Sequence, residues 1–188
     1  MNPESTSLRP VDDGAADHLI GSKLPAISLA LTNGDDIDLS EIRPGWTILF
    51  CYPRTGVPGV ALPEGWEAIP GAVGCTPQAC SFRDLHGELA GLGALIFGVS
   101  TQSSEYQREM VDRLKITYPV LSDSELKLAE AIRLPVFEAG GMTLLKRTTL
   151  IIEDGEIRHV FYPVFPPEES ASEVLNWLQT RRIEGDSK

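Results

Sequence analysis

Residues 46–52 read Trp-Thr-Ile-Leu-Phe-Cys-Tyr, a nearly continuous apolar run with the length of one β-strand. A strand that is apolar on both faces lies in the middle of a sheet that is covered on both sides. A second run of this kind, Ala-Leu-Ile-Phe-Gly-Val-Ser, occupies residues 94–100. Between the runs, apolar residues recur at helical spacing from Phe82 to Leu92. The sequence therefore predicts two buried strands with a helix between them.

The segments on either side extend this pattern. Asn33-Gly34 and Asp154-Gly155 are dipeptides typical of hairpin turns, and each lies between two segments of strand character. The chain order is a hairpin, then β–α–β–α, then ββ–α. This order predicts an α/β protein with a thioredoxin-like fold, a central mixed β-sheet flanked by helices, and an N-terminal β-hairpin. The expected strands are 27–31, 37–39, 46–52, 94–100, 119–121, 146–153 and 156–162, and the expected helices begin near residues 76, 104, 123 and 171.

The bulk properties suit one soluble domain. A chain of 188 residues is long enough for one core and short for two. We expect a flexible polar leader over residues 1–22, the folded domain over 23–182 and a tail over 183–188. The net charge of −11 argues against nucleic acid or an anionic membrane as a partner. Without a recognisable secretory or membrane-spanning segment, the chain is expected to be cytoplasmic, where thiols stay reduced.

One stretch fits neither helix nor central strand. Residues 53–74 carry four prolines and five glycines, and a loop of this length inside a domain is often functional. We expect the part from Gly56 to Gly74 to form a lid over a reactive site. Trp66 and Ile69 are apolar enough to dock that lid against the domain.

Two cysteines stand at the start of the first major helix, in Cys75-Thr-Pro-Gln-Ala-Cys80. Unpaired N–H groups and the helix dipole favour negative charge there, so Cys75 is a candidate reactive thiolate. Five helical residues turn by about 500° and rise roughly 7.5 Å, which leaves the two side chains about 140° apart. A disulfide needs Cα atoms closer than about 7 Å, with side chains that face each other. The pair can therefore bond only transiently, after the helix start has unwound.

At these residues the sequence resembles a known family. The segment Cys-Thr-Pro-Gln-Ala-Cys-Ser-Phe-Arg-Asp at 75–84, preceded by Phe-Cys-Tyr-Pro-Arg at 50–54, is similar to the bacterioferritin-comigratory-protein (Q-type) subgroup of peroxiredoxins. The segments 121–123 and 147–155 are similar as well. The likeness extends from about Leu24 to Leu178.

The resemblance implies an activity and a set of roles. The protein would be a thiol peroxidase that reduces hydrogen peroxide or an alkyl hydroperoxide without a cofactor. Cys75 would attack the peroxide and Cys80 would resolve the product as a disulfide. Arg147 would favour the thiolate and stabilise the leaving oxygen. A thioredoxin or similar dithiol would be the reductant, and the chain would be a monomer or weak dimer.

The chain departs from the family pattern Pro-x-x-x-Thr-x-x-Cys. Pro53 and Cys75 are separated by 21 residues instead of six, and Ala72 stands where the threonine belongs. The hydroxyl that should contact thiolate and peroxide is absent from its expected place. Thr55 is the candidate substitute, provided that the insertion loops out and returns.

Other interpretations stay open at this point. Cys51 lies inside a buried strand run and is expected to be a core residue. Arg147 is also consistent with a surface cation at a strand start, and Arg83 with an ion pair to Asp84. Two other functions remain: a thiol–disulfide oxidoreductase, which the wider cysteine spacing disfavours, and a non-catalytic redox sensor or binding module, which the missing threonine permits.

The histidines do not suggest a metal site. His18, His86 and His159 are scattered along the chain, without a grouped pattern of cysteines or imidazoles. A zinc site needs four clustered ligands, or three and a water. We therefore expect no metal, and His86 lies too far along its helix from Cys75 to act as its base.

Overall fold

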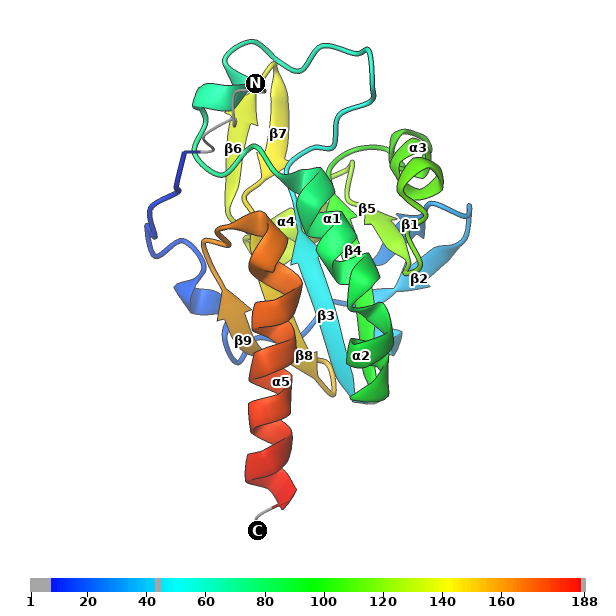
Figure 1. The fold of residues 1–188 in the computed structure, drawn as a ribbon, viewed down its shortest axis with the longest axis vertical. Helices are drawn as coiled ribbons and strands as arrows, with labels where there is room; N and C mark the ends of the chain where they lie inside the picture. Colours follow the sequence, from blue (N-terminus) through cyan, green and yellow to red (C-terminus); the bar gives the residue numbers. More distant parts are fainter. Residues whose placement is uncertain (1–7, 43–44, 187–188) are drawn as a thin grey trace.

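The computed structural model describes residues 8–42 and 45–186, with side chains to residue 183. A seven-stranded mixed sheet forms its centre, in the order β2-β1-β5-β4-β3-β8-β9, and helices cover both faces (Figure 1). The expected thioredoxin-like fold is confirmed. The strands of this sheet are β1 (Ser28–Leu31), β2 (Asp36–Asp38), β3 (Trp46–Cys51), β4 (Ala94–Ser100), β5 (Val120–Ser122), β8 (Thr148–Glu153) and β9 (Glu156–Phe161).

The two apolar runs are the central strands. β3 pairs in parallel with β4 and antiparallel with β8, so every residue of β3 lies between two neighbouring strands. Ile48, Leu49 and Phe50 are fully buried. The helices are α1 (Cys75–Asp84), α2 (His86–Gly91), α3 (Ser104–Leu114), α4 (Lys127–Ala131) and α5 (Ser170–Asp186).

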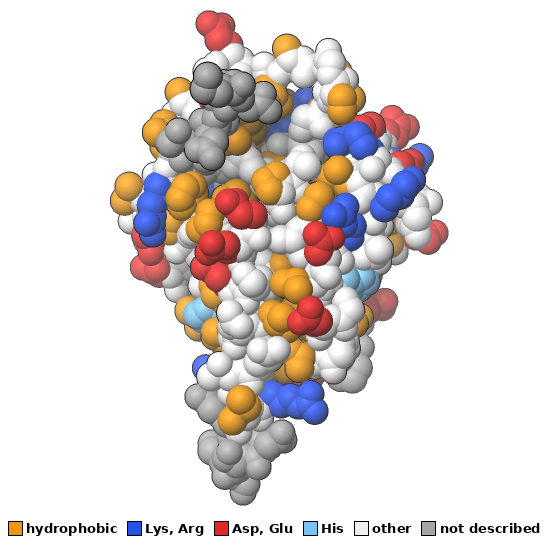
Figure 2. Space-filling view, in the orientation of Figure 1, with side chains coloured by type: hydrophobic (Ala, Val, Ile, Leu, Met, Phe, Trp, Pro, Cys, Tyr) orange, Lys and Arg blue, Asp and Glu red, His pale blue; other side chains and the backbone are white. Residues whose placement is uncertain are grey.

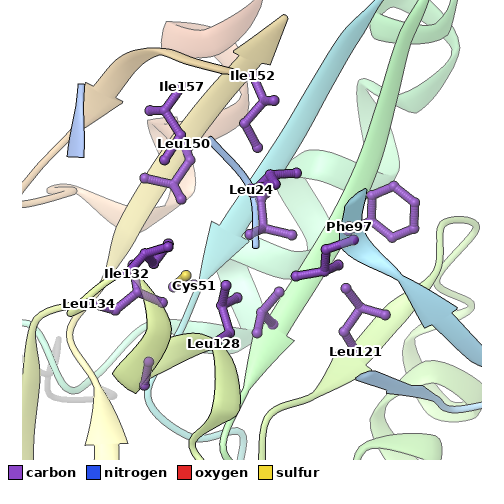
Figure 3. Packing of buried hydrophobic residues seen from close by; sticks show 14 of the residues in the cluster. Leu24, Cys51, Phe97, Leu121, Leu128, Ile132, Leu134, Leu150, Ile152 and Ile157 are labelled. Atoms are coloured by element: carbon purple, nitrogen blue, oxygen red, sulfur yellow. The ribbon is translucent and has the colours of Figure 1, made fainter. Parts of the chain in front are cut away.

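Each face of the sheet has its own core. On one face, α1, α2, α3 and α5 enclose a cluster in which Phe50 stacks on Phe82 with ring centroids 4.2 Å apart. On the other face, α4 and the N-terminal segment pack on the sheet, with Leu24 and Leu128 in the cluster that Figure 3 shows. Successive residues of β3 alternate between these two cores, as strand geometry requires. A side chain on β3 therefore belongs to one core or the other.

The chain ends differ from the sequence prediction. Within the expected flexible leader, residues 1–7 lie outside the described residues, but Ala16 and Leu19 are buried in the core. Leu19 is buried at the end of a short 3₁₀ helix, Asp17–Leu19. The other residues of this helix are polar, so the sequence gives no apolar pattern there. At the other end, α5 continues to Asp186, so the expected tail from residue 183 is helical as far as it is described.

A second, two-stranded sheet was not predicted. β6 (Val136–Ala139) and β7 (Met142–Leu145) form a hairpin whose turn is Gly140-Gly141. The expected helix over 123–134 is shorter at both ends. The Asp123 carboxylate accepts the N–H groups of Leu128 and Ala129, and the helix begins only at Lys127. It ends at Ala131, and Arg133, with φ of 53°, turns the chain toward the hairpin.

The insertion packs against this hairpin. Trp66, in the short helix Trp66–Ala68, is 3% exposed and lies in a cluster with Ala72, Ala139 and Leu144. Its ring centroid is 6.3 Å from that of Phe137. The expected docking of Trp66 is confirmed, and the partner is the unpredicted hairpin. The lid role itself stays a prediction.

Replacing Trp66 by alanine should destabilise the protein by about 3–5 kcal/mol, because a large buried side chain is removed and a cavity is left. Urea unfolding would measure the loss. Val60→Ala is the matched control: Val60 lies in the same insertion but is 54% exposed, and the change should stay within about 0.5 kcal/mol. Equal stability of both variants would show that the insertion does not depend on Trp66.

Candidate active site

Cys75 begins α1 because of the residue before it. Gly74, the N-cap, has φ of 109°, a backbone conformation that favours glycine. A Cβ atom at Gly74 would also overlap Cγ of Pro167. The chain therefore turns into the helix directly at Cys75, against the segment that leads into α5. Cys75 is the first residue of the helix, where the N–H groups have no helical partner, and its side chain belongs to the core cluster with Tyr52 and Phe82.

Arg147 reaches the sulfur from the start of β8. Its Nη2 atom lies 3.3 Å from Cys75 Sγ, and the two residues are 3% and 4% exposed. A guanidinium at this distance favours the thiolate over the thiol. The structure thus brings together two of the predicted site residues, and it excludes the interpretation of Arg147 as a surface cation.

Several acceptors hold this guanidinium in place. Nη2 donates to the carbonyl oxygens of Gly71, Ala72 and Val73, at 3.2, 3.4 and 3.2 Å. Nη1 donates to Oε1 of Gln78 at 2.5 Å. In the described part of the chain, no carboxylate forms an ion pair with Arg147. Its charge is therefore available to an anion at Cys75.

Gln78 is a site residue that the sequence analysis missed. It is fully buried one turn after Cys75, and its Nε2 donates to Oγ of Ser170 at 3.3 Å. Ser170 in turn lies 3.4 Å from Oγ1 of Thr149. Residues three apart share a helix face, and this spacing from Cys75 was the available signal. Gln78 fixes the rotamer of Arg147 without neutralising it.

At the position of the missing threonine, a backbone carbonyl group contacts the Cys75 sulfur in place of a side-chain hydroxyl. The carbonyl oxygen of Ala72 lies 3.7 Å from Cys75 Sγ and accepts its proton in the thiol form. Thr55 is buried, but its N–H and hydroxyl both donate to Oε1 of Gln102, at 2.9 and 3.2 Å. The hydroxyl is therefore engaged elsewhere in this conformation. A role of Thr55 toward the sulfur stays a prediction.

Cys80 lies further along α1. It is partly exposed, and both it and Cys75 are free thiols in this structure. The helix is continuous from Cys75 to Asp84, so the two side chains leave it about 140° apart. This is the reduced arrangement that the spacing predicts.

Comparison with known proteins agrees with this geometry. A family model described as Redoxin matches residues 19–176. The chain belongs to this family. It is 28% identical over 160 residues to the chloroplastic peroxiredoxin Q of Suaeda salsa, and the aligned region covers 85% of this chain and 67% of the relative. It is 34% identical over 112 residues to peroxiredoxin Bcp of Bacillus subtilis, covering 60% and 62%.

Solved structures agree as well. The structure of peroxidoxin BcpB from Mycobacterium tuberculosis superposes with a TM-score of 0.70 at 27% identity, covering 86% of this chain and 96% of that one. The chain is thus a peroxiredoxin of the Q or Bcp type, a group of thiol peroxidases. In the described ranges, every helix is too short or too polar to cross a membrane.

The third cysteine of this peroxiredoxin lies apart from the other two. Cys51 points into the core on the opposite face of the sheet, beside Leu128 and Ile132 (Figure 3). Burial, and to a lesser degree the Asp123 carboxylate, raises the pKa of its thiol far above the ordinary value. Such a thiol stays protonated and unreactive. Cys51 is therefore placed as a structural residue, as its position in the strand predicts.

The histidines also lie outside the site. His18 contacts the carbonyl oxygen of Ile132, His86 contacts Thr117, and His159 stacks on Trp177. Among the described residues, no group of histidines, cysteines and carboxylates could hold a metal ion. Arg83 pairs with the exposed Asp84 at 2.8 Å, the ion pair with which the sequence is consistent.

Arg147→Met should slow the reaction of Cys75 with peroxide by roughly a hundredfold, because the variant loses a charged donor at the reacting atoms. It should also slow the alkylation of Cys75 by iodoacetamide, because the cation 3.3 Å from the sulfur is lost. Stopped-flow peroxide consumption and the alkylation rate at one fixed pH would measure both effects. Arg83→Met is the control, since Arg83 lies on the same helix as Cys75 and pairs with Asp84. Unchanged rates of both reactions in Arg147→Met would remove Arg147 from the site.

Proposed function

We propose that this peroxiredoxin reduces hydrogen peroxide and organic hydroperoxides through Cys75, with Cys80 as the resolving thiol. The observation that carries the proposal is the 3.3 Å contact between Cys75 Sγ and an arginine that has no carboxylate partner among the described residues. The contact supplies what the first step needs, a stabilised thiolate and a donor for the oxygen that leaves.

The first step forms one bond and breaks another. The Cys75 thiolate attacks one oxygen of the peroxide, the O–O bond breaks, and the leaving oxygen takes up a proton as water or alcohol. The product on the protein is a sulfenic acid, Cys–SOH. Arg147 stands beside the sulfur and would stabilise the charge on the leaving oxygen, while Gln78 and the carbonyl groups of residues 71–73 hold the guanidinium still.

The second step closes the disulfide. The Cys80 thiol attacks the sulfenic sulfur, water leaves, and Cys75 and Cys80 become joined. Because the pair cannot bridge while α1 is helical, the first turns of α1 must open after the peroxide has reacted. Reduction by an external dithiol then returns both thiols and allows the helix to close.

The partner and setting follow from this chemistry. We assign a thioredoxin or a similar dithiol as the electron donor, because the cycle needs two electrons and a disulfide acceptor for them. We place the protein in a reducing compartment, the cytoplasm, since free Cys75 and Cys80 are the active form. A monomer or weak dimer is the assembly that we propose.

The cysteine variants should separate the two roles. Cys75→Ser should abolish peroxide reduction, whereas Cys80→Ser should react once and stop at the sulfenic acid, which dimedone then labels. Mass spectrometry after one equivalent of peroxide would identify the product on each variant. Cys51→Ser is the control and should behave as the unmodified protein. A Cys75→Ser variant that turns over peroxide, or that reduces insulin disulfides instead, would overturn the assignment.

Oxidation should also change the dynamics of α1. We expect amide hydrogen exchange to increase over residues 75–85 when the disulfide forms, because these backbone hydrogen bonds must break. The amides of β3 and β4 serve as the internal control and should keep their protection. Unchanged exchange in α1 of the disulfide form would refute the unwinding step.

A further inference from the structure

We propose that the first half of the insertion, residues 56–62, is the docking surface for the dithiol protein that reduces the Cys75–Cys80 disulfide. This inference depends on the proposed function, since it concerns the partner of the same site. The three observations that carry it are the contact of this segment with the end of α3, which is bonded to α1 near Cys80, its exposed apolar side chains, and the low net charge around Cys80.

The end of α3 lies along the Cys80 side of α1. Two hydrogen bonds flank Cys80 along the helix. Tyr118 donates its hydroxyl to the carbonyl oxygen of Ala79 at 2.8 Å, and Arg83 donates Nη1 to the carbonyl oxygen of Leu114 at 2.6 Å. Cys80 itself is partly exposed. The thiol therefore lies on a surface that α1 shares with the end of α3.

Arg113 connects this surface to the insertion. Its Nη2 donates to the carbonyl oxygen of Gly56 at 3.1 Å. The next residue, Leu114, accepts the hydrogen bond from Arg83 of α1. The Leu62 side chain in turn covers Gly56, with Cδ2 3.5 Å from the place of a Cβ atom there. The end of α3 beside the Cys80 part of α1, together with Arg113, Gly56 and Leu62, thus forms one strip.

The two halves of the insertion differ in burial. The second half is docked on the β6–β7 hairpin through Trp66, but Val60 is 54% and Leu62 is 41% exposed. Figure 2 shows scattered hydrophobic side chains along the loop above α3, with basic and acidic side chains close together below them. Single exposed apolar residues are ordinary. Two of them on a segment that is bonded to the end of α3, on the side of α1 that carries Cys80, form a surface that a partner can cover.

The charges around Cys80 favour an apolar partner surface. Arg83 pairs with Asp84 at 2.8 Å, and Arg113 pairs with Glu109 at 2.6 Å. The strip is therefore nearly neutral, although the chain carries a net charge of −11. An apolar rim between neutralised charges offers little to a highly charged partner. It fits a protein whose own reactive cysteine is surrounded by apolar residues.

The chemistry explains why a protein reductant would need this surface. In thiol–disulfide exchange the attacking thiolate must reach one sulfur atom of the disulfide. A protein reductant must therefore bring the surface around its own thiolate into contact with the surface around that sulfur. A small dithiol such as dithiothreitol has no such requirement. Loss of a docking surface should therefore weaken reduction by the protein and leave reduction by dithiothreitol unchanged, whereas damage to the active site would slow both reactions.

The experiment compares these reductants on the variant V60S/L62S. Its KM for a bacterial thioredoxin, kept reduced by its NADPH-dependent reductase, should rise about tenfold, the effect of losing about 1.4 kcal/mol of contact. Reduction of the preformed Cys75–Cys80 disulfide by dithiothreitol, a step that involves no peroxide, should not change. Ile20→Ser is the matched control, because Ile20 is 57% exposed and follows the short helix Asp17–Leu19, outside the strip.

Each outcome decides the proposal. An unchanged KM for thioredoxin, an equal loss with dithiothreitol, or a wild-type disulfide that dithiothreitol reduces and thioredoxin does not, would overturn it. If the wild-type protein forms no Cys75–Cys80 disulfide with peroxide, the proposed function itself fails, and thiol titration shows this separately. As a second measurement, a thioredoxin that lacks its second cysteine should trap a mixed disulfide in which amides 56–62 gain protection from exchange. No added protection there would contradict the docking surface.

Discussion

Arg147 is a buried cation, and the site is arranged around the acceptors that a buried guanidinium needs. Its two Nη atoms find them in three carbonyl oxygens at the end of the insertion, in the amide of Gln78 and in the sulfur of Cys75, whereas its buried Nε has no partner among the described residues. Neutral acceptors satisfy hydrogen bonds without cancelling charge. The cation therefore stays available for the thiolate, and the same bonds fix where the insertion must end and how α1 begins.

This constraint gives the insertion a place in the architecture. Its last residues hold Arg147, its middle is anchored by Trp66 on the β6–β7 hairpin, and its first residues lie beside α3. A segment with three such attachments is no longer a free loop, although it has little regular structure. Its length costs little in closure entropy compared with the packing that Trp66 provides.

The sequence predicted the parts of the fold that carry a strong periodic signal. β3 and β4 are apolar on both faces, and Cys75 follows a glycine at the start of an amphipathic helix, so these elements were found. The β6–β7 hairpin was missed because burial does not alternate regularly along it: Val136 is 39% exposed, whereas the adjacent residues Leu144 and Leu145 are both buried, in two different clusters. Gln78 was missed because a polar residue in a helix looks the same whether it faces solvent or a buried arginine. The contacts of Thr55 depend on Gln102, 47 residues away, which no local pattern contains.

The alternation of β3 has a consequence for how oxidation is confined. Phe50 and Tyr52 point toward the core that contains Cys75, whereas Cys51, between them, points toward the other core. The sulfur of Cys51 and the sulfur of Cys75 thus lie on opposite faces of the sheet, although Cys51 is the last residue of the strand that leads toward the site. In the proposed cycle, oxidation would therefore pass from Cys75 to Cys80 on α1, while the alternation of side chains along β3 keeps the Cys51 thiol in the opposite core.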